Sequence, residues 1–182
     1  MKKEAVCEVL LTTALRLWTE NGLSVSIREI ARVAGVNHGL VHRYFGGRDG
    51  LIRAAINKTR IDLECRLSNQ GEAPTLSQFF SAVSGSSTYA KLIFQLIQEG
   101  YDPLAYQDKF PFFEWLSANQ SELSGEAARD AKMRAAIINA AFTAMLVDWE
   151  YFTKIAGIDD NQDDSQKRAT RLIAEWLDLS GK

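Results

Sequence analysis

Residues 26–45 have the sequence SIREIARVAGVNHGLVHRYF, and this stretch decides the fold. Two short helical segments lie on either side of Gly35, one over about residues 26–34 and one over residues 37–45. Gly35 suits the turn between them, because glycine adopts backbone conformations that a residue with a Cβ atom resists. Two helices joined by a glycine-containing turn of about three residues predict a helix-turn-helix.

Local signals support both helices. Ser26 is a favourable N-cap, and Glu29 three positions later completes the pattern of a capping box. The second helix is expected to end at the glycine pair 46–47. Small and apolar residues are spaced to face one another across the turn, which would let the helices approach closely; these are Ile30, Ala31, Ala34, Val36, Val41 and Phe45.

The outward face of the second helix carries side chains suited to duplex DNA. His38 and His42 are four residues apart and therefore share a face. Short or planar donors can contact base edges in the major groove, and groups near a helix N-terminus can contact phosphates. The candidate DNA-binding residues are Asn37, His38, Gly39, His42 and Arg43 on the face turned to the bases, and Ser26, Arg28, Tyr44 and Arg48 toward the phosphates.

Charge is distributed unevenly along the chain. Residues 1–60 contain ten Lys or Arg residues against five Asp or Glu residues, whereas the whole chain of 182 residues has a net charge of −2. A basic N-terminal third on an acidic remainder is consistent with a polyanionic partner for the first part. Hydrophobic residues make up 46% of the chain, which is typical of a globular protein and argues against disorder.

Helical periodicity also dominates the rest of the sequence, and no convincing strand pattern appears. The first helix is expected to end at Gly22 and to bury the apolar stripe of Cys7, Leu11, Ala14, Leu15 and Trp18. Residues 71–74 are the clearest linker. Further helices are expected over residues 48–69, 75–84, 87–99, 112–120, 127–156 and 165–179. The fold class is therefore all-α.

The N-terminal part resembles the TetR family of transcription regulators. The resemblance covers about residues 11–51 and rests on ALRLW at 14–18, Gly22, SIREIA at 26–31, AGV at 34–36, YF at 44–45 and RDGL at 48–51. It implies an obligate dimer, a three-helix DNA-binding head and a larger helical body that binds a small ligand and dimerises. The chain departs from the family pattern at Leu40, where the family often has Thr or Ser, and at His42, which replaces a common Tyr.

This resemblance and the helix pattern divide the chain into a helix-turn-helix DNA-binding domain, residues 1–47, and a helical ligand-binding and dimerisation domain, residues 48–182. We expect a homodimer through the last two helices, about 127–156 and 165–179. Small residues at helical spacing allow close crossing, and apolar side chains on the last helix supply buried area; these are Ala136, Ala140, Ala144, Leu172, Ile173 and Trp176. Repression at an inverted-repeat operator is the expected activity.

Aromatic residues in the second domain could line a cavity for a small apolar or aromatic effector. The candidates are Phe79, Phe80, Tyr89, Phe94, Phe113, Trp115, Phe142 and Trp149. The alternative for each is ordinary core packing, which we expect for most aromatics of this domain. No cofactor is indicated.

Other functions fit the sequence less well. His38 and His42 could be metal ligands, but they are the only histidines in the chain and no HExxH glutamate accompanies them. The helix-turn-helix could serve protein contact, or the chain could be a ligand-binding module that does not bind DNA. No catalytic Ser/His/Asp or Cys/His set indicates an enzyme once both histidines are assigned.

Location also follows from simple patterns. The isolated Cys7 and Cys65 fit a reducing cytoplasm better than a disulfide framework. No targeting signal is visible, and the most apolar stretch, residues 135–147, is too short to cross a bilayer. We therefore expect a cytoplasmic protein without a membrane partner.

Overall fold

The structure is a computed structural model, and it describes residues 2–68, 78, 82, 87–118, 124–159 and 161–176. Within these ranges every regular element is a helix. The contacts group into two compact units, one formed by Met1–Asp62 with Thr88–Asp108 and one by Leu63–Ser87 with Lys109–Lys182. The helix predicted over 75–84 and the linker predicted over 71–74 lie outside the described residues, except for Gln78 and Ala82.

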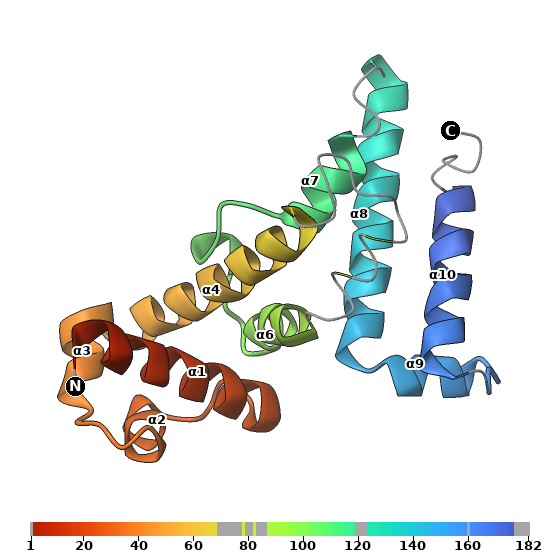
Figure 1. The fold of residues 1–182 in the computed structure, drawn as a ribbon. Helices are drawn as coiled ribbons and strands as arrows, with labels where there is room; N and C mark the ends of the chain where they lie inside the picture. Colours follow the sequence, from red (N-terminus) through yellow and green to blue (C-terminus); the bar gives the residue numbers. More distant parts are fainter. Residues whose placement is uncertain are drawn as a thin grey trace. The chain divides into compact units, whose positions relative to one another are not determined.

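The first unit contains the predicted helix-turn-helix. Figure 1 shows α1, α2 and α3 grouped together with the start of α4. Their bounds, with those of the later elements of this unit, are α1 Lys3–Asn21, α2 Ile27–Val33, α3 Gly39–Phe45, α4 Arg48–Ser68, α6 Ser87–Gln98 and the 3-10 helix η1 Pro103–Ala105. Hydrogen bonds and glycine conformations at the helix ends explain these boundaries. Gly22, with a φ of +83°, ends α1, and its N–H donates to the carbonyl of Trp18.

One hydrophobic core joins all five helices of the first unit. Trp18, Ile30, Val41 and Ile52 are fully buried in it, each from a different helix of α1 to α4. Leu92 and Leu96 of α6 belong to the same core. A fully buried side chain of this size contributes about 1.5–3 kcal/mol of free energy of folding. The three-helix head is therefore stabilised in part by a helix that lies 40 or more residues further along the chain.

The apolar stripe predicted for α1 is wrong in part. Ala14, Leu15 and Trp18 are buried as expected, but Cys7 and Leu11 are only half-buried. The buried positions at the start of the helix are Val6 and Leu10 instead, and Leu17 is buried as well. The burying face is thus rotated by one residue near the N-terminus, because α1 packs against more than one neighbour of the core.

The second unit consists of α7 Pro111–Ala118, α8 Gly125–Val147, α9 Trp149–Ile155 and α10 Gln162–Trp176. The single helix predicted over 127–156 is wrong, since the chain breaks at Asp148, whose φ of −149° and ψ of 84° are not helical. The Oδ1 atom of Asp148 accepts a hydrogen bond of 3.0 Å from the N–H of Tyr151 and so begins α9. An Asp in an apolar run is a good N-cap signal, and it could have been found in the sequence.

Helix α8 buries one face within its own chain. Ala131, Ala135, Ile138, Phe142 and Leu146 form the buried stripe at helical spacing. No helix in the described part of the chain is both long and apolar enough to cross a membrane. Whether the two units coincide with the predicted DNA-binding and ligand-binding domains, divided at residues 47 and 48, stays a prediction.

Candidate nucleic-acid interface

The start of α2 is capped as predicted, but the capping box is only half formed. The Oγ atom of Ser26 accepts a hydrogen bond of 3.2 Å from the N–H of Glu29. The carboxylate of Glu29 does not return to Ser26; it binds the guanidinium of Arg32 at 2.7 and 2.8 Å. The side-chain hydrogen bond from Arg32 lowers the pKa of Glu29. Arg32 is thereby neutralised locally and is a poor candidate for a phosphate contact.

The turn between α2 and α3 has the geometry that the sequence predicts. Gly35 has a φ of +67°, in the left-handed region. The N–H of Gly35 donates to the carbonyl of Arg32, and the N–H of Val36 donates to the carbonyl of Ala31. This pair of hydrogen bonds is a Schellman motif, which satisfies the last carbonyls of α2. Gly35 therefore sets the direction in which α3 leaves the turn.

Helix α3 begins two residues later than predicted, at Gly39. Asn37 precedes the helix, and its Oδ1 atom accepts a hydrogen bond of 2.8 Å from the N–H of Gly39. An ideal Cβ atom at Gly39 would lie only 3.1 Å from this oxygen. Asn37 thus fixes the first turn of α3 with its oxygen, and the side chain stays exposed. Asn37, which was predicted only as a DNA contact, therefore also has a structural role.

The face of α3 that was predicted to contact bases is exposed to solvent. Val41 is fully buried, whereas His38, His42 and Arg43 are exposed, as is Gly39. The backbone at Gly47 lies close to the imidazole of His42. An ideal Cβ atom on Gly47 would lie 3.5 Å from the Nδ1 atom of His42. The described residues contain no group of three or more His, Cys, Asp or Glu side chains that could hold a metal ion.

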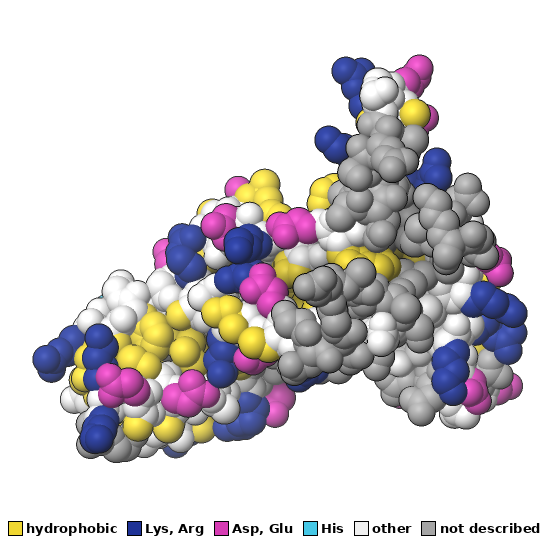
Figure 2. Space-filling view, turned by 45° about the horizontal axis from the view of Figure 1, so that its top comes forward, with side chains coloured by type: hydrophobic (Ala, Val, Ile, Leu, Met, Phe, Trp, Pro, Cys, Tyr) yellow, Lys and Arg dark blue, Asp and Glu magenta, His cyan; other side chains and the backbone are white. Residues whose placement is uncertain are grey.

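Cations gather at the C-terminal end of α3. The guanidinium of Arg43 lies 5.7 Å from the ring centroid of Tyr44, and the ammonium of Lys3 lies 5.8 Å from the same centroid. Tyr44 is half-buried, so its ring orders two exposed cations beside α3. On the face drawn in Figure 2, Lys and Arg side chains alternate with Asp and Glu side chains and form no single basic patch.

Ser26 and Arg28, the candidates at the start of the helix-turn-helix, are both exposed. Arg28 lies in the first turn of α2, where unpaired backbone N–H groups also favour an anion. The positions of these side chains are compatible with the phosphate contacts predicted for them, which stay predictions.

Arg48 has a structural role that the sequence analysis missed. Its guanidinium donates a hydrogen bond of 2.9 Å to the carbonyl of Val25 and lies 5.8 Å from the ring centroid of Trp18. The indole N–H of Trp18 donates to the same carbonyl at 3.2 Å. Two side chains from α1 and α4 thus hold the loop that precedes α2. No local pattern could have revealed this contact, which spans 23 residues.

We expect Arg48→Met to lower the free energy of unfolding by about 1–3 kcal/mol, because a hydrogen bond from a charged donor to a half-buried carbonyl is lost. Chemical denaturation followed by circular dichroism measures the change. Arg28→Met is the matched control, since Arg28 is exposed, and should change stability by less than about 0.5 kcal/mol. Equal stability of the two variants would show that Arg48 does not hold the loop.

Gly50 is a second residue that the sequence analysis missed. It lies in the first turn of α4, and a Cβ atom placed on it would lie 1.6 Å from the carbonyl oxygen of Phe45. Gly46 and Gly47 have φ values of +76° and +118° and turn the chain between the two helices. The end of α3 and the start of α4 are therefore in backbone contact. A glycine inside a predicted helix was the available signal.

In the second unit, two of the predicted aromatics line a pocket. Phe142 and Trp149 border an apolar cavity of about 220 Å³ between α8, α9 and α10. The indole N–H of Trp149 donates a hydrogen bond of 2.8 Å to the Oγ atom of Ser165, which is buried. The ring of Trp149 is thus fixed at one wall of the cavity.

The remaining pocket candidates lie elsewhere. Tyr89 and Phe94 are half-buried in α6, in the first unit; Tyr89 packs against the core of the head and donates to Gln107. Phe113 and Trp115 are half-buried in α7. None of these four lines the cavity of the second unit. Phe79 and Phe80 lie outside the described residues.

The comparison with known proteins concerns the same segment, the helix-turn-helix. Residues 10–55 match the family model "Bacterial regulatory proteins, tetR family", and this range contains α2, the turn and α3. The chain is therefore similar to this family over its helix-turn-helix region. It is 28% identical over 166 residues to the HTH-type transcriptional repressor Rv3405c of Mycobacterium tuberculosis, an alignment that covers 87% of this chain and 81% of that protein. It has the same identity and coverage with the HTH-type transcriptional regulator Mb3439c of Mycobacterium bovis.

Solved structures of transcriptional regulators share the fold of this chain over most of its length. A transcriptional regulator from Rhodococcus sp. RHA1 superposes with a TM-score of 0.65 at 20% identity, covering 93% of this chain and 96% of that one. A regulator from Aquifex aeolicus superposes with a TM-score of 0.62 at 15% identity, covering 96% and 98%. The chain is therefore a helix-turn-helix transcription regulator, and every regular element in the described residues of its C-terminal part is a helix.

Proposed function

We propose that the protein is a dimeric repressor that binds an inverted-repeat operator through α3 and is released by a small apolar or aromatic effector. The observation that carries the DNA-binding part is the exposure of His38, at the N-cap of α3, and of His42 and Arg43, on a helix in which Val41 is fully buried. Such a helix can lie in a major groove without unfolding any part of the head. The repressor name of the mycobacterial relative supports the direction of regulation.

An exposed apolar face on α8 supports the dimer. Met133 and Ile137 are 62% and 61% exposed, and Ala136 and Ala140 beside them are exposed as well. These four residues share one face at helical spacing. On α10, Leu172 is 40% exposed. A contiguous apolar face of this kind is typical of a surface that a protein partner covers, and a two-fold dimer covers it with its own copy.

We expect Ile137→Glu to convert the dimer into monomer, because a dimer would bury this charge twice next to the symmetry axis without a partner. Sedimentation velocity at micromolar concentration measures the change. The matched control is Ile97→Glu on α6 of the first unit, where Ile97 is 57% exposed, and it should leave the dimer intact. A wild-type protein that sediments only as monomer contradicts the proposed dimer.

The cavity of the second unit supports a small apolar effector. Its lining is almost entirely apolar, with Phe142, Met145 and Trp149 on one side and Leu172 and Ile173 on the other. Release from DNA requires that the effector binds the released state more tightly than the DNA-bound state. Helix α4 is the proposed link between the effector cavity and the helix-turn-helix. Only two residues separate it from α3, and its own residues belong to both units.

The experiment that tests the DNA-binding function is selection of bound duplexes from a random pool with the full chain. We expect an inverted repeat whose half-site centres lie about 10 base pairs apart, one helical turn, or a multiple of it. Failure to enrich any sequence would favour the other hypothesis, a helical ligand-binding or protein-interaction module whose helix-turn-helix does not bind DNA.

We expect His42→Ala to weaken binding to the selected operator by about 1–3 kcal/mol and to relax base preference at one position of each half-site. The reason is that an exposed imidazole on α3 can pair with only one base edge per half-site. Titration of the operator and of single-base variants measures both effects. A loss that is equal on all sequences would instead make His42 a backbone contact, and Lys154→Ala on α9 serves as the control for a distant side chain.

A further inference from the structure

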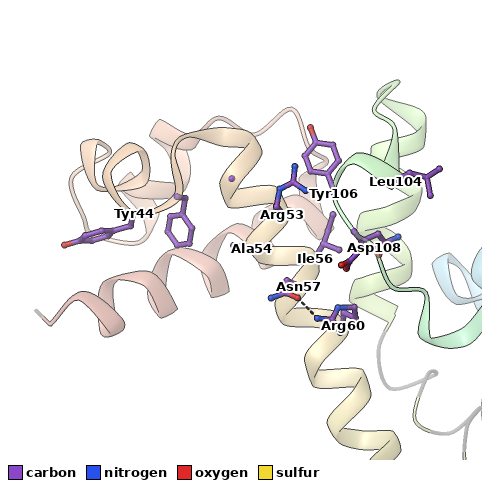
Figure 3. Close-up of a pocket in the computed structure, with 12 residues that line it drawn as sticks. Tyr44, Arg53, Ala54, Ile56, Asn57, Arg60, Leu104, Tyr106 and Asp108 are labelled. Atoms are coloured by element: carbon purple, nitrogen blue, oxygen red, sulfur yellow. Dashed lines mark hydrogen bonds between the residues drawn. The ribbon is translucent and has the colours of Figure 1, made fainter. Parts of the chain in front are cut away.

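A large groove lies within the first unit, separate from the effector cavity proposed above. It has a volume of about 720 Å³ and runs along α4, with the end of α3 at one side and residues 103–108 opposite (Figure 3). Its lining combines charged, amide and aromatic groups. The lining residues that matter for its chemistry are Phe45, Arg53, Asn57, Arg60, Tyr106 and Asp108.

Two guanidinium groups give the groove its character. Arg53 is exposed, and its guanidinium lies 5.5 Å from the ring centroid of Tyr106. In the part of the chain that the structure describes, no carboxylate forms an ion pair with Arg53. Arg60 is half-buried one helical turn beyond Asn57, and its NH2 group donates to the Oδ1 atom of Asn57 at 2.6 Å. Arginine with planar donors in this arrangement suits a carboxylate.

One carboxylate, Asp108, also lines the groove. Its side chain is exposed, as that of Arg53 is, so solvent screens both charges. The other nearby acid, Asp49, accepts a hydrogen bond of 3.3 Å from the hydroxyl of Tyr106. The charged side chains that line the groove are two arginines, Arg53 and Arg60, and one aspartate, Asp108.

The aromatic wall of the groove is held in place. The hydroxyl of Tyr106 is bound to Asp49, and its ring meets the ring of Tyr101 edge to face at a centroid distance of 5.9 Å. Burial, followed by the charge of Asp49, raises the pKa of Tyr106, so its hydroxyl stays neutral. Gln107 is fixed by the hydroxyl of Tyr89, which donates to its Oε1 atom at 2.6 Å. A flat apolar body therefore meets a preorganised surface, which reduces the entropic cost of binding.

We infer that this groove binds a small organic carboxylate with a flat apolar body, its anionic group on Arg53 and its body against Tyr106 and Phe45. This site goes beyond the proposed function, since the effector named in the proposed function binds in the cavity of the second unit. Its position next to α3 gives it a direct route to DNA affinity. Phe45 and Tyr44 both line the groove and both belong to α3, the helix proposed to contact bases.

The test uses the full chain and two matched probes, naphthalene-2-carboxylate and the uncharged naphthalene-2-carboxamide. Isothermal titration calorimetry without DNA gives the dissociation constants. We expect the carboxylate to bind about two- to fivefold more tightly than the amide, since an ion pair with an exposed arginine contributes up to about 1 kcal/mol. Arg53→Gln should abolish this preference, while Arg28→Gln, an exposed arginine on α2 that does not line the groove, should preserve it.

A second measurement locates the probe. In nitrogen-15 correlation spectra, the side-chain amide signals of Asn57 and Gln107 should shift on addition of the carboxylate, and that of Asn21 at the end of α1 should not. Equal affinity for acid and amide, an unchanged preference in Arg53→Gln, or unshifted Asn57 and Gln107 signals would each overturn the inference. Because DNA is absent from both measurements, failure of the operator selection leaves this result unaffected, and failure here leaves the operator selection unaffected.

Discussion

Gly50→Ala is expected to destabilise the DNA-binding head by about 3 kcal/mol or more, because the added methyl group would meet the backbone of Phe45. The carbonyl oxygen would lie 1.6 Å and the carbonyl carbon 2.8 Å from the new Cβ atom. Neither atom is the end of a flexible side chain, so the junction of α3 and α4 must move. Chemical denaturation measures the loss of stability, and operator titration measures the accompanying loss of DNA affinity.

The sign of this effect separates two physical arguments. Helix propensity alone predicts that Ala at a helical position is about 1 kcal/mol more stable than Gly. The close approach to Phe45 predicts the opposite sign. Ala54→Gly, one turn further along α4, is the matched control and should cost only about 0.5–1 kcal/mol. A stabilised Gly50→Ala variant with unchanged DNA affinity would show that the two helices are not in backbone contact.

Raising the salt concentration from about 50 to about 200 mM is expected to weaken operator binding by about 10³-fold or more, the loss for a protein that makes six or more phosphate contacts. A dimer presents its ordered cations twice, and three of them lie on or beside the helix-turn-helix: Lys3, Arg28 and Arg43 are all exposed. Fluorescence anisotropy with a labelled operator, repeated at several salt concentrations, gives the slope of log K against log salt.

Substitution of a single cation sharpens this prediction. Arg43→Gln should reduce the magnitude of the slope by about two, because one phosphate contact is lost from each of two subunits. Lys154→Gln should leave the slope unchanged, since Lys154 lies on α9 and pairs with Glu150 at 2.6 Å. A flat salt response of the wild-type protein would contradict binding to the phosphate backbone. An unchanged slope in Arg43→Gln would assign this side chain to a role other than phosphate contact.

The points at which helices begin and end could be predicted less well in the second unit than in the first. The N-cap at Asp148 interrupts an apolar run that otherwise continues the helical period, and periodicity alone does not detect such a break. Helices α2 and α3 of the head have seven residues each, and each is bounded by a strong signal, Ser26 or a glycine. The exposure of His38, His42 and Arg43 could be predicted in the same way, since these side chains are polar whereas Val41 is apolar and buried; their contacts with DNA stay a prediction.

The sequence by itself determined the helix-turn-helix and its outward face, because N-caps, left-handed glycines and helical spacing act within a few residues. Only the tertiary structure decided what Arg48, Gly50 and α6 do. The carbonyl partner of Arg48 is 23 residues away, the clash at Gly50 depends on how α4 approaches α3, and α6 joins the head core from beyond α4. These contacts depend on how helices pack, and packing brings together side chains whose separation along the chain follows no local period.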